Sequence, residues 1–173
     1  MNMNLLRVLG LAVLLGLTGV ALRAATVSAT VNSFSGTAEF APPGSSSFSP
    51  LQKGQELPIG STVRTGDDGT AVLVTTPGSS IEVGNDSVLK INDLAFARNS
   101  SGVTERKARL ELTSGVVSAM IDPSTPKITD FKIQTPQGVA AARGTFYAVV
   151  VMHGKSYALV NRGKVGVVAT PIR

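Results

Sequence analysis

Few side chains in this sequence are of the types that perform catalysis or bind ions, and the run Arg143-Gly144-Thr145 stands out among them. It interrupts an apolar stretch that extends from Thr135 to Val151. A guanidinium beside a glycine amide could bind an anion, or it could pin a backbone corner by donating to carbonyls or a carboxylate. Phosphate-binding glycine loops normally open a helix, and no helical pattern follows here. We therefore expect a structural corner with a buried arginine stem, and the anion site is the alternative.

The other reactive residues do not form a catalytic pattern. His153 is the sole histidine, it precedes a glycine in an expected turn, and the chain has no cysteine. A zinc or copper site would therefore need carboxylates almost alone, and a serine nucleophile would lack a positioned base. Asp67-Asp68-Gly69 lacks the alternating ligand spacing of a calcium loop, so we interpret it as a hairpin turn, with calcium as the alternative. We expect no enzymatic activity, no cofactor and no metal.

The elements that must position these residues are short β-strands. Apolar and polar residues alternate with period two along most of the chain, as at Leu110-Glu111-Leu112 and Phe131-Lys132-Ile133. Turn signals rich in Gly, Pro, Asn and Asp separate the strands at intervals of about 8–12 residues, which is typical of all-β domains. The sequence predicts one all-β domain, and its loose rhythm of strand and glycine turn leaves a solenoid-like winding open.

Some segments depart from simple alternation. The denser apolar runs Ala71–Val74, Val116–Ile121 and Phe146–Met152 predict strands that are covered on both faces. Two polar segments, Pro42–Pro50 and Asn92–Lys107, predict long loops.

The densest basic cluster, Arg106, Lys107 and Arg109, lies beside Glu105 and Glu111, and no aromatic residue is interleaved with it. A nucleic-acid surface needs a broader basic face with stacking side chains. We therefore expect a solvated loop and strand edge at this cluster, and no nucleic-acid partner.

Residues 1–24 have the pattern of a signal peptide. Arg7 precedes an apolar run from Val8 to Leu22, which is short for a membrane-spanning helix, and small residues follow at Ala24-Ala25. The alternative is an uncleaved N-terminal anchor. Cleavage would leave 14 basic and 11 acidic side chains, a net charge of +3, in a periplasmic or secreted protein without a transmembrane span. The absence of cysteine excludes a lipoprotein.

The run TPQGVAAARGTFYAVVV resembles the signature of FecR-like domains, in which TP-x-G precedes a small or apolar stretch and then RGT-x-aromatic-x-V. The matching residues are Thr135, Pro136, Gly138, Arg143, Gly144, Thr145, Tyr147 and Val149. Upstream, ARLELTSGVV is similar to the family's L-x-x-G-x-V step, and LQKGQELPIGSTVRTGDDGTAVLVTTPGSSIEV is similar to its opening. The resemblance covers about Thr26 to Val168.

This resemblance implies an extracytoplasmic all-β domain over residues 25–173, wound as a twisted β-roll or short β-solenoid, in which the signature residues have structural roles. In the family's best-known members the domain lies in the periplasm and helps relay occupancy of a TonB-dependent receptor to a sigma-factor regulator. Few residues precede the apolar segment here, so we expect no cytoplasmic sigma-binding part. We therefore expect a non-catalytic binding module that engages an envelope or membrane protein. The alternative is a cell-envelope structural or glycan-binding protein.

Overall fold

The computed structural model describes residues 27–169, and every regular element in this range is a β-strand. The predicted signal peptide, residues 1–24, lies outside the described residues. The strands are β1 (Ser28–Ser35), β2 (Ala38–Ala41), β3 (Ser49–Pro50), β4 (Glu56–Pro58), β5 (Thr62–Thr65), β6 (Thr70–Thr76), β7 (Ser79–Val83), β8 (Val88–Asn99), β9 (Gly102–Ile121), β10 (Thr129–Thr135), β11 (Gly138–Ala142), β12 (Phe146–Met152), β13 (Lys155–Arg162) and β14 (Val165–Ala169).

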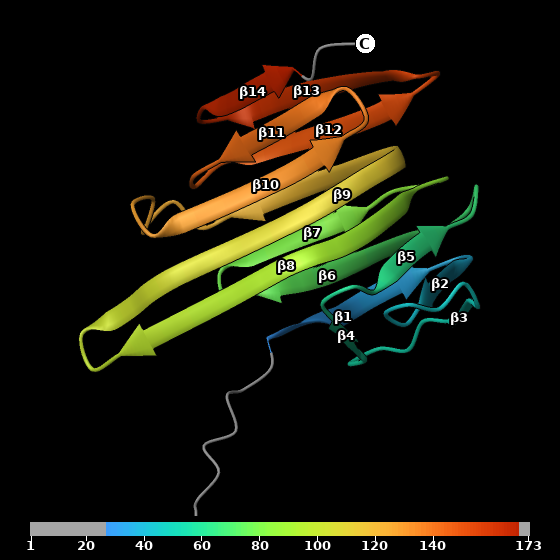
Figure 1. Ribbon diagram of the computed structural model, residues 1–173, viewed down its shortest axis with the longest axis horizontal. Coiled ribbons are helices and arrows are strands. Elements are labelled where there is room, and N and C mark those ends of the chain that lie inside the picture. Colours follow the sequence, from blue (N-terminus) through green and yellow to red (C-terminus); the bar gives the residue numbers. More distant parts are fainter. Residues whose placement is uncertain (1–26, 170–173) are drawn as a thin grey trace, which may run out of the picture.

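The strands form one sheet that folds back on itself along β9 into two layers. Layer A has the order β4-β1-β6-β7-β9-β12-β13, and layer B has the order β3-β2-β5-β8-β9-β10-β11-β14. Figure 1 shows the strands following one another from the N-terminal end, at β1 to β4, to the C-terminal end, at β13 and β14, with a common tilt. The prediction of a single all-β domain with a rolled winding is confirmed.

The long strand β9 joins the two layers because it bends at Gly115. Its first part pairs with β8 and β10 in layer B, and its last part pairs with β7 and β12 in layer A. Gly115 has φ +87, and a Cβ at this position would overlap the Ser87 side chain. Only glycine adopts such a backbone without strain, so Gly115 allows one strand to serve both layers.

The core lies between the two layers and follows the period-two alternation. Leu73, Leu110, Phe131 and Tyr147 are among its fully buried side chains. Full burial of an apolar side chain such as Leu73, Leu110 or Phe131 stabilises the fold by about 1.5–3 kcal/mol. The alternation in the sequence therefore predicts correctly which face of these strands points inward.

Two expectations about long loops were wrong or incomplete. Pro42–Pro50 is a loop up to Phe48, but Ser49–Pro50 forms β3. Asn92–Lys107 is not a loop: it forms the end of the long β8–β9 hairpin, with Leu94 paired with Ala108. Polar side chains dominate this segment because the hairpin end projects beyond the other strands (Figure 1) and both of its faces can be hydrated. The ion pair between Lys107 and Asp93 supports the pairing.

The dense apolar runs are strands, but the prediction that both faces are covered was wrong. In the described chain Val74, Met120 and Met152 are 37%, 61% and 53% exposed, because they point away from the core. The turn at Gly66–Gly69 was also misinterpreted as a hairpin. It connects β5 in layer B to β6 in layer A, and these strands do not pair. Turn residues specify that the chain reverses, but not which layer the next strand joins.

Candidate functional site

The run Arg143-Gly144-Thr145 is the corner at which the chain leaves β11 in layer B and enters β12 in layer A. Gly144 has φ +76, and a Cβ there would lie 2.5 Å from Cα of Pro123. The buried Thr145 donates its hydroxyl to the carbonyl of Arg162, and its own carbonyl accepts from the Ile121 amide at 3.0 Å. The prediction of a glycine corner with a close backbone approach is confirmed.

The prediction of a buried arginine clamp at Arg143 was wrong. Arg143 is exposed, and none of the polar contacts among residues 27–169 involves its guanidinium. The reason is register: Ala140 and Ala142 point into the core, so the next residue points to solvent. Arg143 lines an open cavity of about 540 Å³ with Lys132 and Lys164, and the anion site stays a prediction.

The first part of the signature forms the β10–β11 hairpin. Thr135 pairs with Gly138 across the turn at Pro136 and Gln137. The Thr135 hydroxyl accepts from the Gln137 amide at 3.3 Å and donates to the Gly138 carbonyl at 3.1 Å. Gly138 lies directly against β14, where a Cβ would overlap the carbonyl of Val168. The signature therefore builds the C-terminal end of the molecule by placing β11, β12 and β14.

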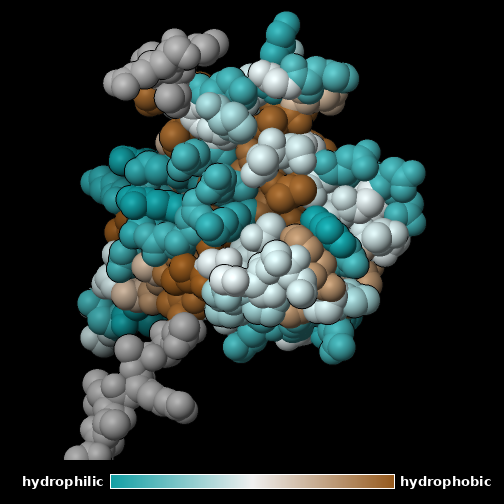
Figure 2. Space-filling model, turned by 45° about the vertical axis from the view of Figure 1, so that its right-hand side comes forward, coloured by the Kyte–Doolittle hydropathy of each residue, from teal (hydrophilic) through white to brown (hydrophobic). Residues whose placement is uncertain are grey.

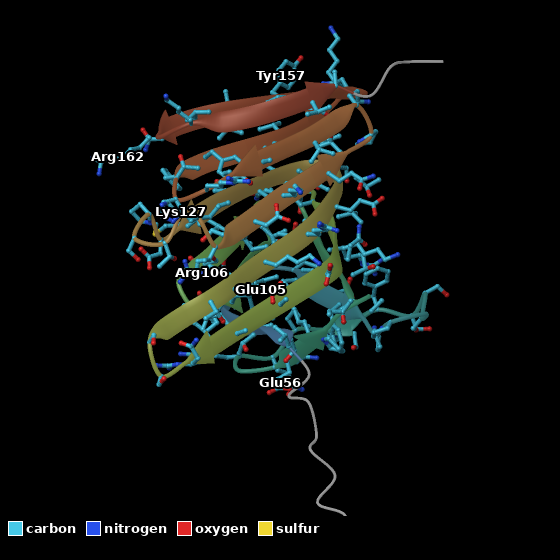
Figure 3. All side chains as sticks on the ribbon, turned by 60° about the vertical axis from the view of Figure 1, so that its left-hand side comes forward. Glu56, Glu105, Arg106, Lys127, Tyr157 and Arg162 are labelled. Carbon is cyan, nitrogen blue, oxygen red and sulfur yellow. The ribbon has the colours of Figure 1, made fainter. Side chains whose placement is uncertain are left out.

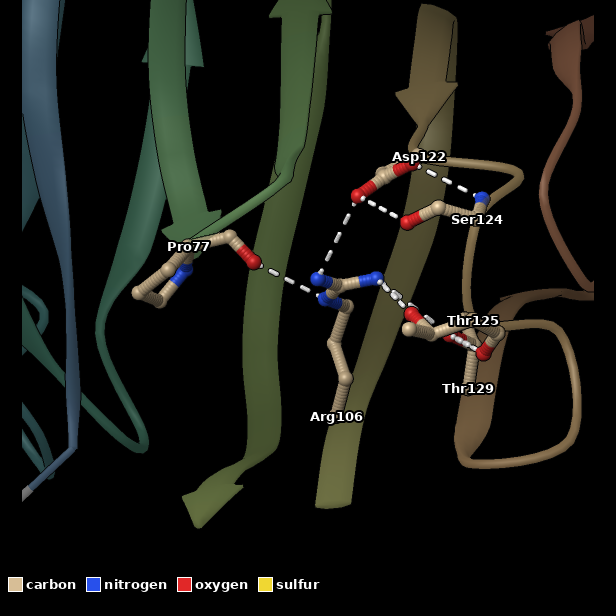
Figure 4. A network of polar contacts seen from close by, with 6 residues as sticks. All are labelled: Pro77, Arg106, Asp122, Ser124, Thr125 and Thr129. Atoms are coloured by element: carbon tan, nitrogen blue, oxygen red, sulfur yellow. Dashed lines mark hydrogen bonds and ion pairs between the residues drawn. The ribbon is translucent and has the colours of Figure 1, made fainter. Parts of the chain in front are cut away.

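A buried arginine clamp does exist, but at Arg106, where the sequence predicts a solvated loop and strand edge (Figure 4). Arg106 is 4% exposed. Its Nε donates to the Pro77 carbonyl at 2.8 Å, and its Nη1 donates to the hydroxyls of Thr125 at 2.7 Å and Thr129 at 3.5 Å. Its Nη2 lies 3.7 Å from Oδ2 of Asp122. The clamp therefore joins the β6–β7 turn to the connection between β9 and β10.

Two further features support the Arg106 clamp. The Asp122 carboxylate accepts from the Ser124 amide and hydroxyl, both at 2.8 Å, and these bonds hold its pKa below the usual range. Gly78 packs against the guanidinium, where a Cβ would lie 2.7 Å from Nη2. One sequence signal could have identified the clamp: Arg106 lies two residues before Ala108, in phase with the buried Leu110 and Leu112.

The C-terminal end of the molecule is open. β13 pairs only with β12, and β14 pairs only with β11, so each leaves one edge unpaired within the described chain. Val160 lies opposite the fully buried Tyr147, and Val167 lies opposite the buried Ala140. Both valines are on the inward side of their strands, yet they are 46% and 62% exposed. The interior between the layers is therefore accessible here, and a cavity of about 200 Å³ lies between β11, β12, β13 and β14.

The N-terminal end of the molecule is closed by contrast. Leu51 and Leu57 are 2% and 0% exposed. The edge strands at this end have two and three residues, and they end in Pro50 and Pro58. Short strands and prolines are devices that prevent further strand pairing. The two ends of the same roll therefore differ in their capacity to bind another strand.

Exposed apolar side chains are concentrated near the open end. Strands β12, β13 and β14 hold seven of the eleven exposed large hydrophobic side chains in the described chain, namely Phe146, Met152, Tyr157, Leu159, Val160, Val167 and Val168. Figure 2, in which the C-terminal end is at the top, shows apolar surface in the middle of the view, between two areas of hydrophilic surface. Large exposed apolar areas rimmed by polar residues mark interaction sites. We take the open end, formed by β13 and β14, as the candidate functional site.

Comparison with known proteins identifies one family. Residues 61–166 match the family described as FecR protein, which is more than half of the chain and includes the β10–β11 hairpin and the Arg143–Thr145 corner. No curated protein matches the chain. A crystal structure of a protein provisionally named an anti-sigma factor, from Parabacteroides distasonis, is similar at 14% identity with a TM-score of 0.43. The match covers 63% of this chain and 50% of that protein, so the chain spans half of its length.

Proposed function

The chain belongs to the FecR protein family, and from this premise we propose that it is a non-catalytic regulatory module that binds another protein of the cell envelope. The open end at β13 and β14 is the binding site. The partner adds a strand to one of these free edges, a mode of recognition in which main-chain hydrogen bonds provide affinity and alternate side chains provide specificity.

The single observation that carries this proposal is the exposure of Val160 and Val167. Both occupy inward positions of edge strands, and both remain about half exposed or more. Burying such side chains stabilises a complex by about 25 cal/mol per Å² of apolar area. A strand added to β13 would cover Val160 and satisfy the unpaired backbone groups of that edge, and a strand added to β14 would do the same at Val167.

The use of polar side chains supports a non-catalytic role. The Arg106 guanidinium, the hydroxyl of Thr135 and the hydroxyl of Thr145 all make hydrogen bonds that hold loops or corners. His153 is exposed in the β12–β13 turn, with φ +49. The side chains that could take part in catalysis therefore either hold the fold together by hydrogen bonds, as Arg106, Thr135 and Thr145 do, or are exposed in a turn, as His153 is.

A location outside the cytoplasm is part of the proposal and rests on the pattern of residues 1–24. The part of the chain that the structure describes contains no helix long and apolar enough to cross a membrane. N-terminal sequencing of protein recovered from the host would test export. A mature chain that begins at or near Ala25 supports it, whereas an intact Met1 in the cytoplasmic fraction contradicts it.

The binding site is tested by photo-cross-linking in the native envelope with a probe placed in β13. The disruptive variant combines Val160→Lys and Val167→Lys, because inward-pointing charges on edge strands block strand addition. Val74→Lys is the matched control: Val74 is 37% exposed but lies in the central strand β6, which has neighbours on both sides.

We expect a discrete cross-linked protein with the wild type and with Val74→Lys, and its loss with the double variant. All three proteins should keep their circular dichroism spectra. Capture that survives in the folded double variant would contradict binding at the open end. Cross-linking to wall glycan alone would favour a structural role in the envelope.

A further inference from the structure

The charges of this protein are strongly segregated along the roll. All eleven acidic residues precede Phe131, whereas residues 131–169 carry five basic side chains and no acidic one: Lys132, Arg143, Lys155, Arg162 and Lys164. Residues 27–130 carry eleven acidic and eight basic side chains, a net charge of −3. Figure 3 shows Tyr157 and Arg162 at one end of the molecule and Glu56 at the opposite end. The open end is therefore the positive end.

We propose that the segment captured at the open end is an acidic β-strand of another protein, which extends layer A by pairing with β13. This inference rests on the proposed function, and it adds the chemistry of the partner and the strand that receives it. Strand β13 has eight residues and β14 has five, so β13 offers the longer edge.

The side chains of β13 specify what such a segment needs. Ser156, Ala158 and Val160 alternate toward the interior, and Lys155, Tyr157 and Leu159 alternate toward the outer face. Directly opposed residues on neighbouring strands have Cβ atoms about 4.5–5.5 Å apart, within reach of charge pairing and apolar contact. The fitting segment therefore has apolar residues opposite Ala158 and Val160, and carboxylates near its two ends, opposite Lys155 and Arg162.

A second copy of this chain fits the open end poorly. Two open ends placed together would bring Lys155, Arg162 and Lys164 of one copy against the same residues of the other, and residues 131–169 hold no carboxylate to compensate them. The negative end of a second copy has the right charge, but its edge strands are short and end in Pro50 and Pro58. Proline cannot donate to a strand ladder, so this end is a poor strand donor. An acidic strand of another protein meets both requirements, because it has the negative charge and backbone amides that can pair along the whole edge.

The test uses the exported chain and two fluorescein-labelled peptides of the same length. Both have a six-residue core of alternating valine and threonine. The acidic probe carries two aspartates at each end, and the basic probe carries two lysines at each end. Fluorescence anisotropy at low salt should show the acidic probe binding about tenfold more tightly than the basic probe, with the difference reduced in 0.5 M salt.

Two sets of variants complete the test. The double variant Lys155→Glu and Arg162→Glu should reverse the preference between the probes, because it changes charge without changing the backbone edge. The variant Val160→Lys should weaken both probes, and Val74→Lys should change neither.

The outcomes separate this inference from the proposed function. Equal binding of the two probes that is lost in Val160→Lys would overturn the acidic preference and leave strand addition in place. Binding of neither probe, with envelope capture still sensitive to Val160→Lys, would overturn an acidic strand as the occupant. Envelope capture insensitive to Val160→Lys and Val167→Lys would overturn the proposed function and this inference together.

Discussion

Replacing Arg106 by alanine should destabilise the protein far more than the same change at Arg109. Both arginines lie on β9, but Arg106 is 4% exposed, whereas the Arg109 side chain is 48% exposed. Arg106 makes two short hydrogen bonds, to the Pro77 carbonyl at 2.8 Å and to the Thr125 hydroxyl at 2.7 Å. Arg109 makes one contact to Asp130, at 3.4 Å.

The magnitude follows from these contacts. Hydrogen bonds from a charged donor stabilise a fold by about 1.5–3 kcal/mol each, so the two short bonds of Arg106 contribute about 3–6 kcal/mol. Removing the buried guanidinium recovers part of its dehydration cost, which is a few kcal/mol. The net loss for Arg106→Ala is about 3 kcal/mol. A domain of about 150 residues loses about 2–4 °C in Tm per kcal/mol, so Tm should fall by about 6–12 °C.

Thermal unfolding followed by circular dichroism at pH 7 measures this difference. Arg109→Ala is the control and should lower Tm by no more than about 4 °C, because an exposed ion pair contributes about 0–1 kcal/mol. Arg106→Lys should give an intermediate loss, since it keeps the charge but not the planar arrangement of donors. A Tm for Arg106→Ala within 2 °C of the wild type, or equal losses for both alanine variants, would refute the clamp.

Two further predictions concern the corner glycine and acid stability. Gly144→Ala should lower the free energy of unfolding by at least about 2 kcal/mol, because it adds a backbone collision to an unfavourable φ, whereas Gly154→Ala, with φ +69 and open space around it, should cost about 1 kcal/mol. Chemical denaturation measures the free energy of unfolding of both variants. Equal losses in Gly144→Ala and Gly154→Ala would show that the collision with Pro123 costs nothing and would contradict this prediction. The backbone amide and then the hydroxyl of Thr37 hold the pKa of Asp68 below its usual value. A lowered pKa contributes stability that is present above about pH 4 and is lost as pH falls through the folded-state pKa. The Tm of Asp68→Asn should therefore fall less steeply than that of the wild type as the pH is lowered below 4. Identical profiles of Tm against pH would contradict this.

The signature residues show how much of the site the sequence could predict. Gly144 was assigned correctly as a backbone corner, because glycine permits the positive φ that the corner needs, whatever surrounds it. The buried arginine clamp was predicted at Arg143, whereas the structure places it at Arg106. Arg143 and Arg106 are both near apolar residues in the sequence, and only the phase of each strand decides that Arg106 points inward and Arg143 outward.

The long β8–β9 hairpin is a second place where the structure differs from what the sequence predicts. Its end, Asn92–Lys107, was predicted as a loop because the segment is rich in polar and charged residues. The strands form there because each backbone finds its partner across the hairpin, from Asn99 paired with Gly102 down to Val88 paired with Ser114. Backbone pairing does not depend on an apolar face, so side-chain patterning could not reveal it.

The sequence by itself determined the all-β class, the positions of most turns, the inward face of most strands and the membership of the FecR family. These properties depend on local patterns: alternation with period two, and residues that allow or forbid particular φ values. Only the tertiary structure decided that β9 belongs to both layers, that Arg106 meets Pro77, Thr125 and Asp122, and that the C-terminal end is open. Each of these depends on which distant segments meet. Val160 has the same apolar character as a core valine, and it is exposed only because no strand of the described chain lies beyond β13.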